Sequence, residues 1–198
     1  MFNQGLSLDQ APPISIPFRF FLSAPIFGVL ISLVFFLSPF NEISNQYSYL
    51  AIGVVHLFTL GILSMIIFGA MQQMMPVLAG AIIKKPRLFA NIVHPSLVLG
   101  TLFMSFSFIF EIKILLHIGV FFLTISFLTF FIFSIKLLFK VEFLTSTVKA
   151  MRLFSIAGFI TLILGLYLAI GHMSLNISEQ HYAFVNMHIL FALFGFAL

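Results

Sequence analysis

The chain contains apolar runs of about 20 residues or more, and these runs restrict its fold more than any other feature. A backbone in lipid has no water to bond with, so each run must satisfy its own N–H and C=O groups as a helix. Runs of this length exceed the strands of a membrane β-barrel. Only 7% of the residues are charged, against about a quarter in soluble domains, which excludes a soluble globular protein. The sequence therefore predicts an all-α polytopic transmembrane bundle.

The hydropathy pattern divides the chain into a polar tail and about six helices. Residues 1–17 form the tail, and because they hold no basic residue and no apolar core we do not expect them to be a cleavable signal peptide. The helical domain covers residues 18–198. We expect the last helix to be truncated, since its ~16 apolar residues span roughly 24 Å, and we interpret the chain as a fragment of a longer protein. The expected helices are about 18–38, 48–75, 90–110, 114–138, 150–171 and 183–198.

Basic residues predict the orientation of the bundle. Eight of the nine lysines and arginines fall at one side, which the positive-inside rule makes cytoplasmic, with the N-terminus inside. Tyr47, Tyr49 and Tyr182 fall at the opposite boundary, as interfacial anchors do. The net charge of +4 therefore reports topology and indicates no nucleic acid. The eight basic residues are Arg19, Lys84, Lys85, Arg87, Lys136, Lys140, Lys149 and Arg152.

Six histidines are the most informative residues, because an ionisable side chain inside a span is costly and usually functional. His56 lies about eight residues inside the outer end of the second expected helix, and His188 about five inside that of the sixth. Both imidazoles are therefore expected ~10 Å below the outer surface. Two histidines at one depth on different helices form an arrangement that clamps a haem iron from both faces. Gly53, one turn above His56, is expected to give clearance for a macrocycle.

Three further histidines fall at the same outer boundary. His117, His172 and His181 are weaker candidates for metal ligands. His181 precedes His188 by seven residues, so a helix that covers both places them on one face. Each intramembrane histidine also has a structural interpretation, as a hydrogen-bond partner for a hydroxyl or carbonyl of a neighbouring helix.

Other residue types add constraints on metal sites and helix ends. Met71, Met74 and Met75 offer thioether ligands for Cu(I), and the alternative is that they fill space around a kink. Pro76 is expected to kink or end the second helix. His94 and the proline after it are typical of the first turn of a helix, at the cytoplasmic end. The chain has no cysteine, which excludes disulfides, iron–sulfur clusters and covalent haem attachment.

The second expected helix resembles a known family. Its spacing is similar to the first histidine-bearing helix of the NnrS family, the haem- and copper-containing membrane proteins of the bacterial nitric oxide response. The segment Phe18-Arg19-Phe20-Phe21 is similar to that family's opening motif. More distantly, residues 76–91 resemble the catalytic subunit I of haem-copper oxidases. The residues that carry the helix-two resemblance are His56, Gly61, Gly69, Pro76 and Gly80.

The resemblance implies a cofactor and a location. His188 followed by Gly195 is similar to the next histidine-bearing helix of such proteins, which implies a non-covalent b-type haem held by His56 and His188. Copper is a further cofactor of these families. The implied location is the bacterial inner membrane, with the lipid bilayer, the remaining helices of a parent chain or other membrane subunits as partners. Val55 and Leu57 flank His56 where the nitric oxide family tends to have a second histidine and a glutamate.

The expected function is therefore haem binding, with handling of electrons or of a diatomic gas, O2 or NO, near the outer face. Whether this amounts to an oxidoreductase activity stays open. A transporter or channel is a different class, and the absence of Asp and Glu from the expected spans argues against ion coupling. A non-catalytic assembly subunit of a membrane complex is the third class.

Overall fold

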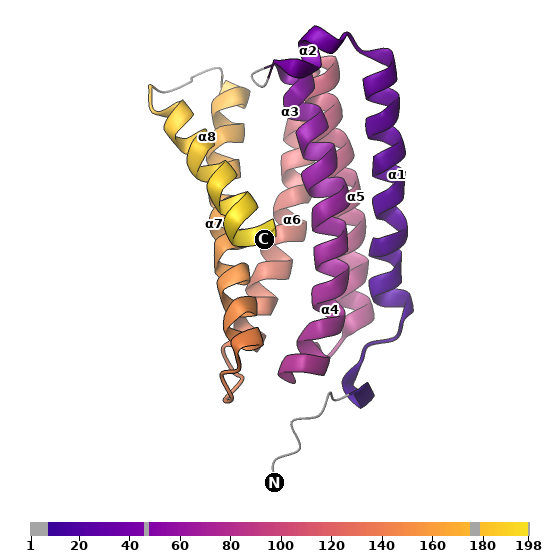
Figure 1. Ribbon diagram of the computed structural model, residues 1–198, viewed down its shortest axis with the longest axis vertical. Helices are drawn as coiled ribbons and strands as arrows, with labels where there is room; N and C mark the ends of the chain where they lie inside the picture. The colour runs from indigo at the N-terminus through magenta and orange to yellow at the C-terminus, as the bar shows by residue number, and fades with distance from the viewer. Residues whose placement is uncertain (1–7, 46–47, 175–178, 198) are drawn as a thin grey trace.

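In a computed structural model, the described residues 8–45, 48–174 and 179–197 form a bundle of helices without any strand (Figure 1). The predicted all-α fold is confirmed. Tyr47 and the first seven residues of the predicted tail lie outside the described residues. The helices are α1 (Ser15–Leu37), α2 (Phe40–Ser44), α3 (Tyr49–His56), α4 (Met65–Ala79), α5 (Pro86–Phe110), α6 (Lys113–Leu138), α7 (Ser146–Ser174) and α8 (His181–Leu190), with the 3-10 helix η1 (Leu8–Gln10) and the π-helical segments η2 (Leu57–Ser64) and η3 (Phe191–Ala197).

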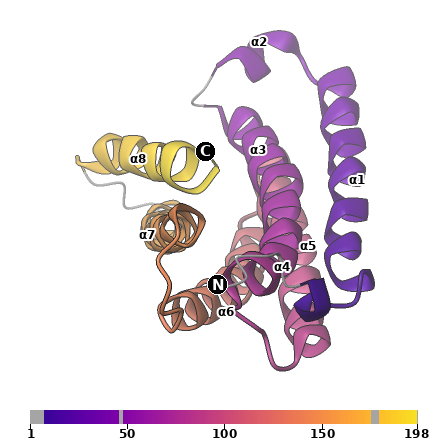
Figure 2. The same cartoon turned by 60° about the horizontal axis from the view of Figure 1, so that its bottom comes forward.

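The helices pack mostly against their neighbours in the chain. α1 packs against η2 and α4, α5 packs against both α3 and α6, and α7 packs against α6. α8 and η3 lie on α7, on the side of the bundle away from α1 (Figure 2). Figure 1 shows α2 at one end of the bundle and η1 at the other. We call these the α2 end and the η1 end.

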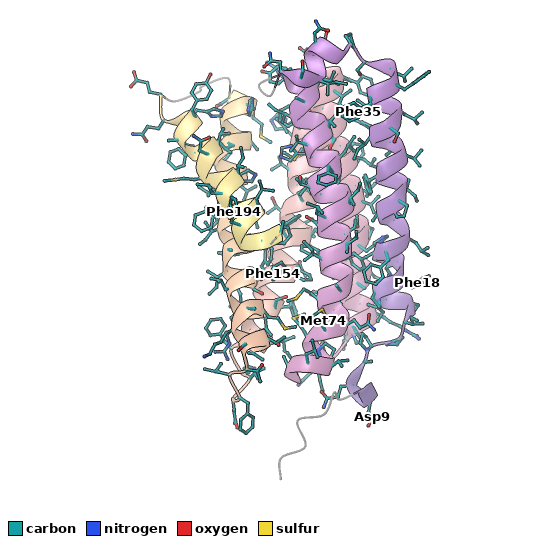
Figure 3. All side chains as sticks on the ribbon, in the orientation of Figure 1. Asp9, Phe18, Phe35, Met74, Phe154 and Phe194 are labelled. Atoms are coloured by element: carbon teal, nitrogen blue, oxygen red, sulfur yellow. The ribbon has the colours of Figure 1, made fainter. Side chains whose placement is uncertain are left out.

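The described helices are long and apolar enough to identify a membrane protein. Five helical stretches meet the length and hydropathy of a span: α1, the continuous stretch Tyr49–Ala79, α5, α6 and α7. The apolar helix His181–Ala197 is shorter. α1 exposes a full apolar stripe, and Phe18 at its start points away from the bundle (Figure 3). Such a face is stable in lipid and not in water, so the chain is an integral membrane protein in contact with the bilayer. The stripe consists of Leu22, Ile26, Val29, Leu33 and Phe36.

Two helix ends differ from the sequence-based expectation at prolines. The prediction that His94 and Pro95 lie in the first turn of a helix is wrong, because α5 begins at Pro86 and passes through Pro95. A proline in the first turn leaves no N–H unsatisfied there, and Pro86 is the proline with that role. The second span continues through Pro76 to Ala79. The other spans differ from their expected bounds by one to four residues at an end, and α2 was not expected.

The core of the bundle is a cluster of phenylalanine rings. Phe68 of α4 stacks on Phe130 of α6 with ring centroids 3.7 Å apart, and it contacts Phe131 edge-on at 5.9 Å. Phe196 of η3 reaches the same cluster and stacks on Phe154 of α7 at 5.1 Å. Because lipid chains are as apolar as these rings, close packing is what holds the helices together. η3 is thereby fixed to the core.

Glycines allow the helices to approach each other closely. A Cβ at Gly61 would lie 2.4 Å from the ring of Phe27, and one at Gly119 would lie 2.5 Å from the backbone N of Met104. Contacts this short have no room for a side chain, so α1 meets η2 and α5 meets α6 at these glycines. Gly61 is therefore a helix-packing position.

Arg152 of α7 caps the C-terminal end of α6, at the η1 end of the bundle. Its Nε and Nη2 donate to the carbonyl of Leu138 at 3.0 and 2.8 Å, and Nη2 also donates to the carbonyl of Val141 at 2.9 Å. The guanidinium lies over the ring of Phe139, 4.7 Å from its centroid. The last carbonyls of a helix have no partner within the helix, and Arg152 donates to that of Leu138, the last residue of α6, and to that of Val141 in the connection that follows.

We expect Arg152→Ala to lower the free energy of unfolding in detergent by about 2 kcal/mol, because three hydrogen bonds from a charged donor to the carbonyls of Leu138 and Val141 are lost. Thermal unfolding followed by circular dichroism measures the change. Arg87→Ala is the matched control, since Arg87 is exposed at the start of α5. Equal stability of the Arg152→Ala and Arg87→Ala proteins would contradict this role.

Candidate functional site

Aromatic and imidazole rings from four helices meet near the α2 end. His172, at the end of α7, lies 5.4 Å from the ring of His181 of α8 and 6.0 Å from that of Tyr49 of α3, centroid to centroid. Phe108 of α5 packs edge-on against His172 at 5.5 Å. We call Tyr49, His172 and His181 the terminal level. It links three helices of the bundle at the end where α2 lies.

His56 lies deeper, at the end of α3. Its ring stacks on Phe108, with the centroids 6.2 Å apart and the planes inclined by 19°. Its Nδ1 lies 2.8 Å from the carbonyl oxygen of Ile52, one turn earlier. Because a carbonyl only accepts hydrogen bonds, Nδ1 carries the proton in this contact and Nε2 is left with its lone pair. His56 therefore presents Nε2 as a basic nitrogen.

His188 of α8 has the same arrangement on the facing helix pair. Its Nδ1 donates to the carbonyl of Thr161 of α7 at 3.1 Å, which again leaves Nε2 as the basic nitrogen. The ring lies over Gly165 of α7, where a Cβ would be 3.0 Å from the ring atom Cε1. Glycine at this position makes the room that the imidazole occupies. His188 is thus oriented by α7 and not by its own helix.

Counting residues along the helices from contacts at the terminal level places His56 and His188 at a similar depth. Seven residues separate Tyr49 from His56 along α3, and seven separate His172 from Gly165 along α7. Both distances correspond to two helical turns, or ~10 Å. Since Tyr49 contacts His172 and His188 contacts Gly165, the two imidazoles lie equally far below the terminal level. We call His56 and His188 the inner level.

The inner histidines also share one region of the bundle. His56 and His172 both pack against the ring of Phe108, and His188 is hydrogen-bonded to α7, the helix that carries His172. Each inner histidine precedes a π-helical segment: η2 begins directly after His56, and η3 begins three residues after His188. Such departures from α-helical geometry are frequent at functional sites.

The predicted glycines lie against helices. A Cβ at Gly53 would be 2.7 Å from Cγ1 of Ile109, and one at Gly195 would be 2.6 Å from Cβ of Ala157. The space beside Gly53 is therefore occupied by α5, and that beside Gly195 by α7. The glycine that faces a histidine is Gly165, which the sequence analysis missed. The sequence feature that could have identified Gly165 is its position on an apolar helix, seven residues before His172.

The remaining metal candidates do not join this group. His117 is exposed at the start of α6, and its Nδ1 donates to the carbonyl of Lys113 at 3.0 Å. Met71 and Met75 are buried one turn apart, whereas Met74 is 40% exposed, so the three thioethers do not point to one place. Among the described residues, no group of three or more His, Cys, Asp or Glu could hold a metal ion. A haem iron needs no such group of three, because the protein supplies at most its two axial ligands.

Comparison with known proteins adds no relative: no protein-family model matches the chain, and no curated protein or solved structure matches it significantly. The fold and the histidines therefore define the class of protein by themselves. It is a polytopic α-helical membrane protein with two imidazoles at matched depth on α3 and α8.

Proposed function

We propose that the protein binds a b-type haem through Nε2 of His56 and Nε2 of His188, and that it handles electrons or a diatomic gas, O2 or NO, near the α2 end. The matched pair of imidazoles carries this proposal. Each has its Nδ1 fixed by a backbone carbonyl, which sets the tautomer and aims Nε2. Histidines that ligate metals characteristically donate their other nitrogen to a carbonyl or carboxylate in this way.

The surrounding residues fit the same group. Phe108 offers a flat apolar surface beside His56, and Gly165 makes room for the His188 ring. Tyr49, His172 and His181 place polar groups ~10 Å nearer the α2 end, where they would pair with the carboxylates of a haem. Bound haem supplies a one-electron centre and, when one axial position is free, a binding site for gas.

Optical spectroscopy of the protein, expressed from its complete gene with haem supplied, tests the proposal. Visible bands of low-spin iron in the purified protein support it. A colourless protein under these conditions would contradict it and would favour a transporter, a channel or an assembly subunit. Copper is tested on the same sample by elemental analysis, with His172 and His181 as the ligands closest to each other.

We also propose that the η1 end faces the cytoplasm of a bacterial inner membrane. Lys84, Lys85 and Arg87 lie in the connection before α5 or in its first turn, and Arg152 caps α6 at the same end. Basic residues are retained on the cytoplasmic side because translocating them is unfavourable. The α2 end, with Glu42 of α2, then faces outward.

The absence of cysteine makes this orientation directly measurable. We expect Asn45→Cys to react with an impermeant thiol reagent added to intact cells, and Lys85→Cys to react only after the membrane is permeabilised. The unsubstituted protein is the control for background labelling. Reaction of Lys85→Cys from outside, with Asn45→Cys protected, would reverse the assignment.

A further inference from the structure

Basic and polar side chains connect α1 to α5 near the η1 end, on the side of the bundle away from α7 and α8 (Figure 2). Nη1 of Arg19 in α1 donates to Oδ1 of Asn91 in α5 at 2.6 Å. Nε of Arg19 donates to the carbonyl of Ser15, one turn earlier, at 3.3 Å. Arg87 precedes Asn91 by four residues and therefore lies on the same face of α5. We call Arg19, Arg87 and Asn91 the α1–α5 cluster.

Ser23 and His94 join the same two helices one turn deeper. Oγ of Ser23 donates to the carbonyl of Arg19 at 3.0 Å and lies 2.8 Å from Nε2 of His94. The His94 ring packs edge-on against Phe20 of α1, with the centroids 4.9 Å apart. These contacts hold the backbone of Arg19 against α5. The guanidinium is therefore positioned by two packed helices and not by a loop.

The α1–α5 cluster keeps N–H donors without a partner. Nη2 of Arg19 and Nδ2 of Asn91 make no hydrogen bond within residues 8–45, 48–174 and 179–197, and the Arg87 side chain makes none there either. Because Oδ1 of Asn91 accepts from Arg19, the NH2 group is the part of the amide that stays available. Arg19 is half-buried, whereas Arg87 and Asn91 are exposed. The cluster thus suits an anion with several oxygens, such as a phosphate.

The charge of the η1 end also favours an anion. Eight basic residues lie at this end, against two carboxylates, Asp9 of η1 and Glu142 after α6. Both carboxylates are exposed, and in the part of the chain that the structure describes neither forms an ion pair with Arg19 or Arg87. The positive charges of the cluster are therefore not neutralised by the protein itself.

The α1–α5 cluster lies at the depth of lipid headgroups. Arg19 is four residues inside the start of α1 and Asn91 five residues inside that of α5, or ~6–8 Å. Helices of 23 and 25 residues are roughly 35 Å long, so their first turns extend beyond a hydrocarbon core of ~30 Å. Deeper on the Arg19 face of α1 the exposed side chains are apolar, since Leu22 and Ile26 are each 61% exposed. A ligand here is an anion with an apolar continuation.

We propose that the α1–α5 cluster binds the phosphate of an anionic phospholipid of the phosphatidylglycerol type, with an acyl chain along Leu22 and Ile26. Arg19 and Asn91 donate to the phosphate oxygens, and Arg87 adds a positive charge one turn nearer the membrane surface. Phosphatidylethanolamine has the same phosphate and also an ammonium group, which the two arginines repel. The proposal depends neither on haem nor on which side of the membrane the η1 end faces.

Native mass spectrometry of the protein released from detergent tests the proposal. The protein is mixed with equal amounts of dioleoyl phosphatidylglycerol and dioleoyl phosphatidylethanolamine, and the mass identifies the lipid that stays bound. We expect about tenfold more phosphatidylglycerol, because the ammonium group would lie close to two like charges. Equal retention of both lipids would overturn the proposal. Retention of neither would also overturn it and would make an acidic protein segment the ligand to test.

Inorganic phosphate distinguishes a lipid from a free anion. We expect phosphate at the lipid concentration to leave phosphatidylglycerol bound, because it has no acyl chain to contact Leu22 and Ile26. Displacement of the lipid by phosphate would show that the cluster binds any such anion, and it would contradict a lipid site.

Two variants assign the lipid preference to the α1–α5 cluster. Arg19→Gln removes the charge, so it is expected to lower the retention of phosphatidylglycerol about tenfold. Asn91→Asp keeps an oxygen that accepts from Arg19 and places a carboxylate beside the guanidinium. It is therefore expected to fold and to show a similar loss. Retention of the preference in either protein would refute the site.

Lys149→Gln and Thr147→Asp are the matched controls, because they make the same changes of charge at the same end of the bundle. Lys149 and Thr147 are exposed in the first turn of α7, on the side away from α1. We expect both proteins to keep the preference for phosphatidylglycerol. A loss in these controls equal to that in the cluster variants would show that only the total charge attracts the lipid, and the proposal would fail.

The same measurement on the His56→Ala protein keeps this result separate from that for haem. His56 and the α1–α5 cluster lie at different ends of the bundle, so the lipid preference is expected to be unchanged. Lipid binding without haem, or haem without lipid binding, then tells which of the two proposals fails.

Discussion

Reduced protein purified with haem is expected to show the sharp visible bands of six-coordinate low-spin iron, and His56→Ala is expected to lower its haem content at least about tenfold. Two imidazole nitrogens are strong donors that pair the electrons of the iron. The chain has no cysteine to attach haem covalently, so the axial bonds and packing must retain it. The ratio of the haem band to protein absorbance in the purified variant measures the loss.

His94→Ala is the matched control for this prediction. His94 is also an intramembrane histidine, but it lies on the α1 side of α5, where its Nε2 is 2.8 Å from Oγ of Ser23 and its ring packs edge-on against Phe20. These contacts are those of a structural histidine that joins two helices. The His94→Ala protein should therefore keep its haem, even where its stability is lower. An unchanged spectrum in the His56→Ala protein would exclude His56 as a ligand.

Chain composition and the length of the apolar runs were sufficient to predict the fold, since each run must form its own helix in lipid. Helix ends were less predictable. Either Pro86 or Pro95 could occupy the first turn of the third span. Which of them does so depends on where the chain leaves the lipid. The basic residues before Pro86 mark that boundary, and the sequence-based prediction placed it too late.

The candidate ligands could be found by counting residues, but their surroundings could not. His56 and His188 were selected because their depth follows from helical rise alone. Phe108, Thr161 and Gly165 were not selected, because their contacts depend on how α5 and α7 pack. A glycine in a membrane helix indicates a close contact without saying with what, so Gly53 was assigned to a macrocycle and lies against α5 instead.

The second large effect is expected when one of the two proposed axial ligands of the haem iron is removed. We expect His188→Ala to leave a five-coordinate iron held by His56, because removing one ring opens a site on the face toward α8. Such an iron takes up carbon monoxide or nitric oxide, whereas the unsubstituted protein with two axial imidazoles does not. The difference spectrum with carbon monoxide measures this change, and a strong signal should appear only in the variant.

A variant that keeps the histidine separates ligation from a general loss of packing. In Gly165→Leu the new side chain would fill the space over which the His188 ring lies, since even its Cβ would be 3.0 Å from Cε1. The ring must move, so this variant should bind carbon monoxide as His188→Ala does. Gly28→Leu is the control, because a Cβ at Gly28 meets only an ordinary contact with Ile62 at 3.8 Å.

The three spectra together distinguish two modes of ligation. If the unsubstituted protein already binds carbon monoxide and the His188→Ala and Gly165→Leu proteins behave identically to it, the iron has one axial histidine, His56, and an open gas site. If carbon monoxide binds only when His188 is removed or displaced, both imidazoles hold the iron and the protein transfers electrons in its resting state. The contact of His188 with Thr161 and Gly165 favours the second outcome, because α7 fixes the ring with Nε2 as its basic nitrogen.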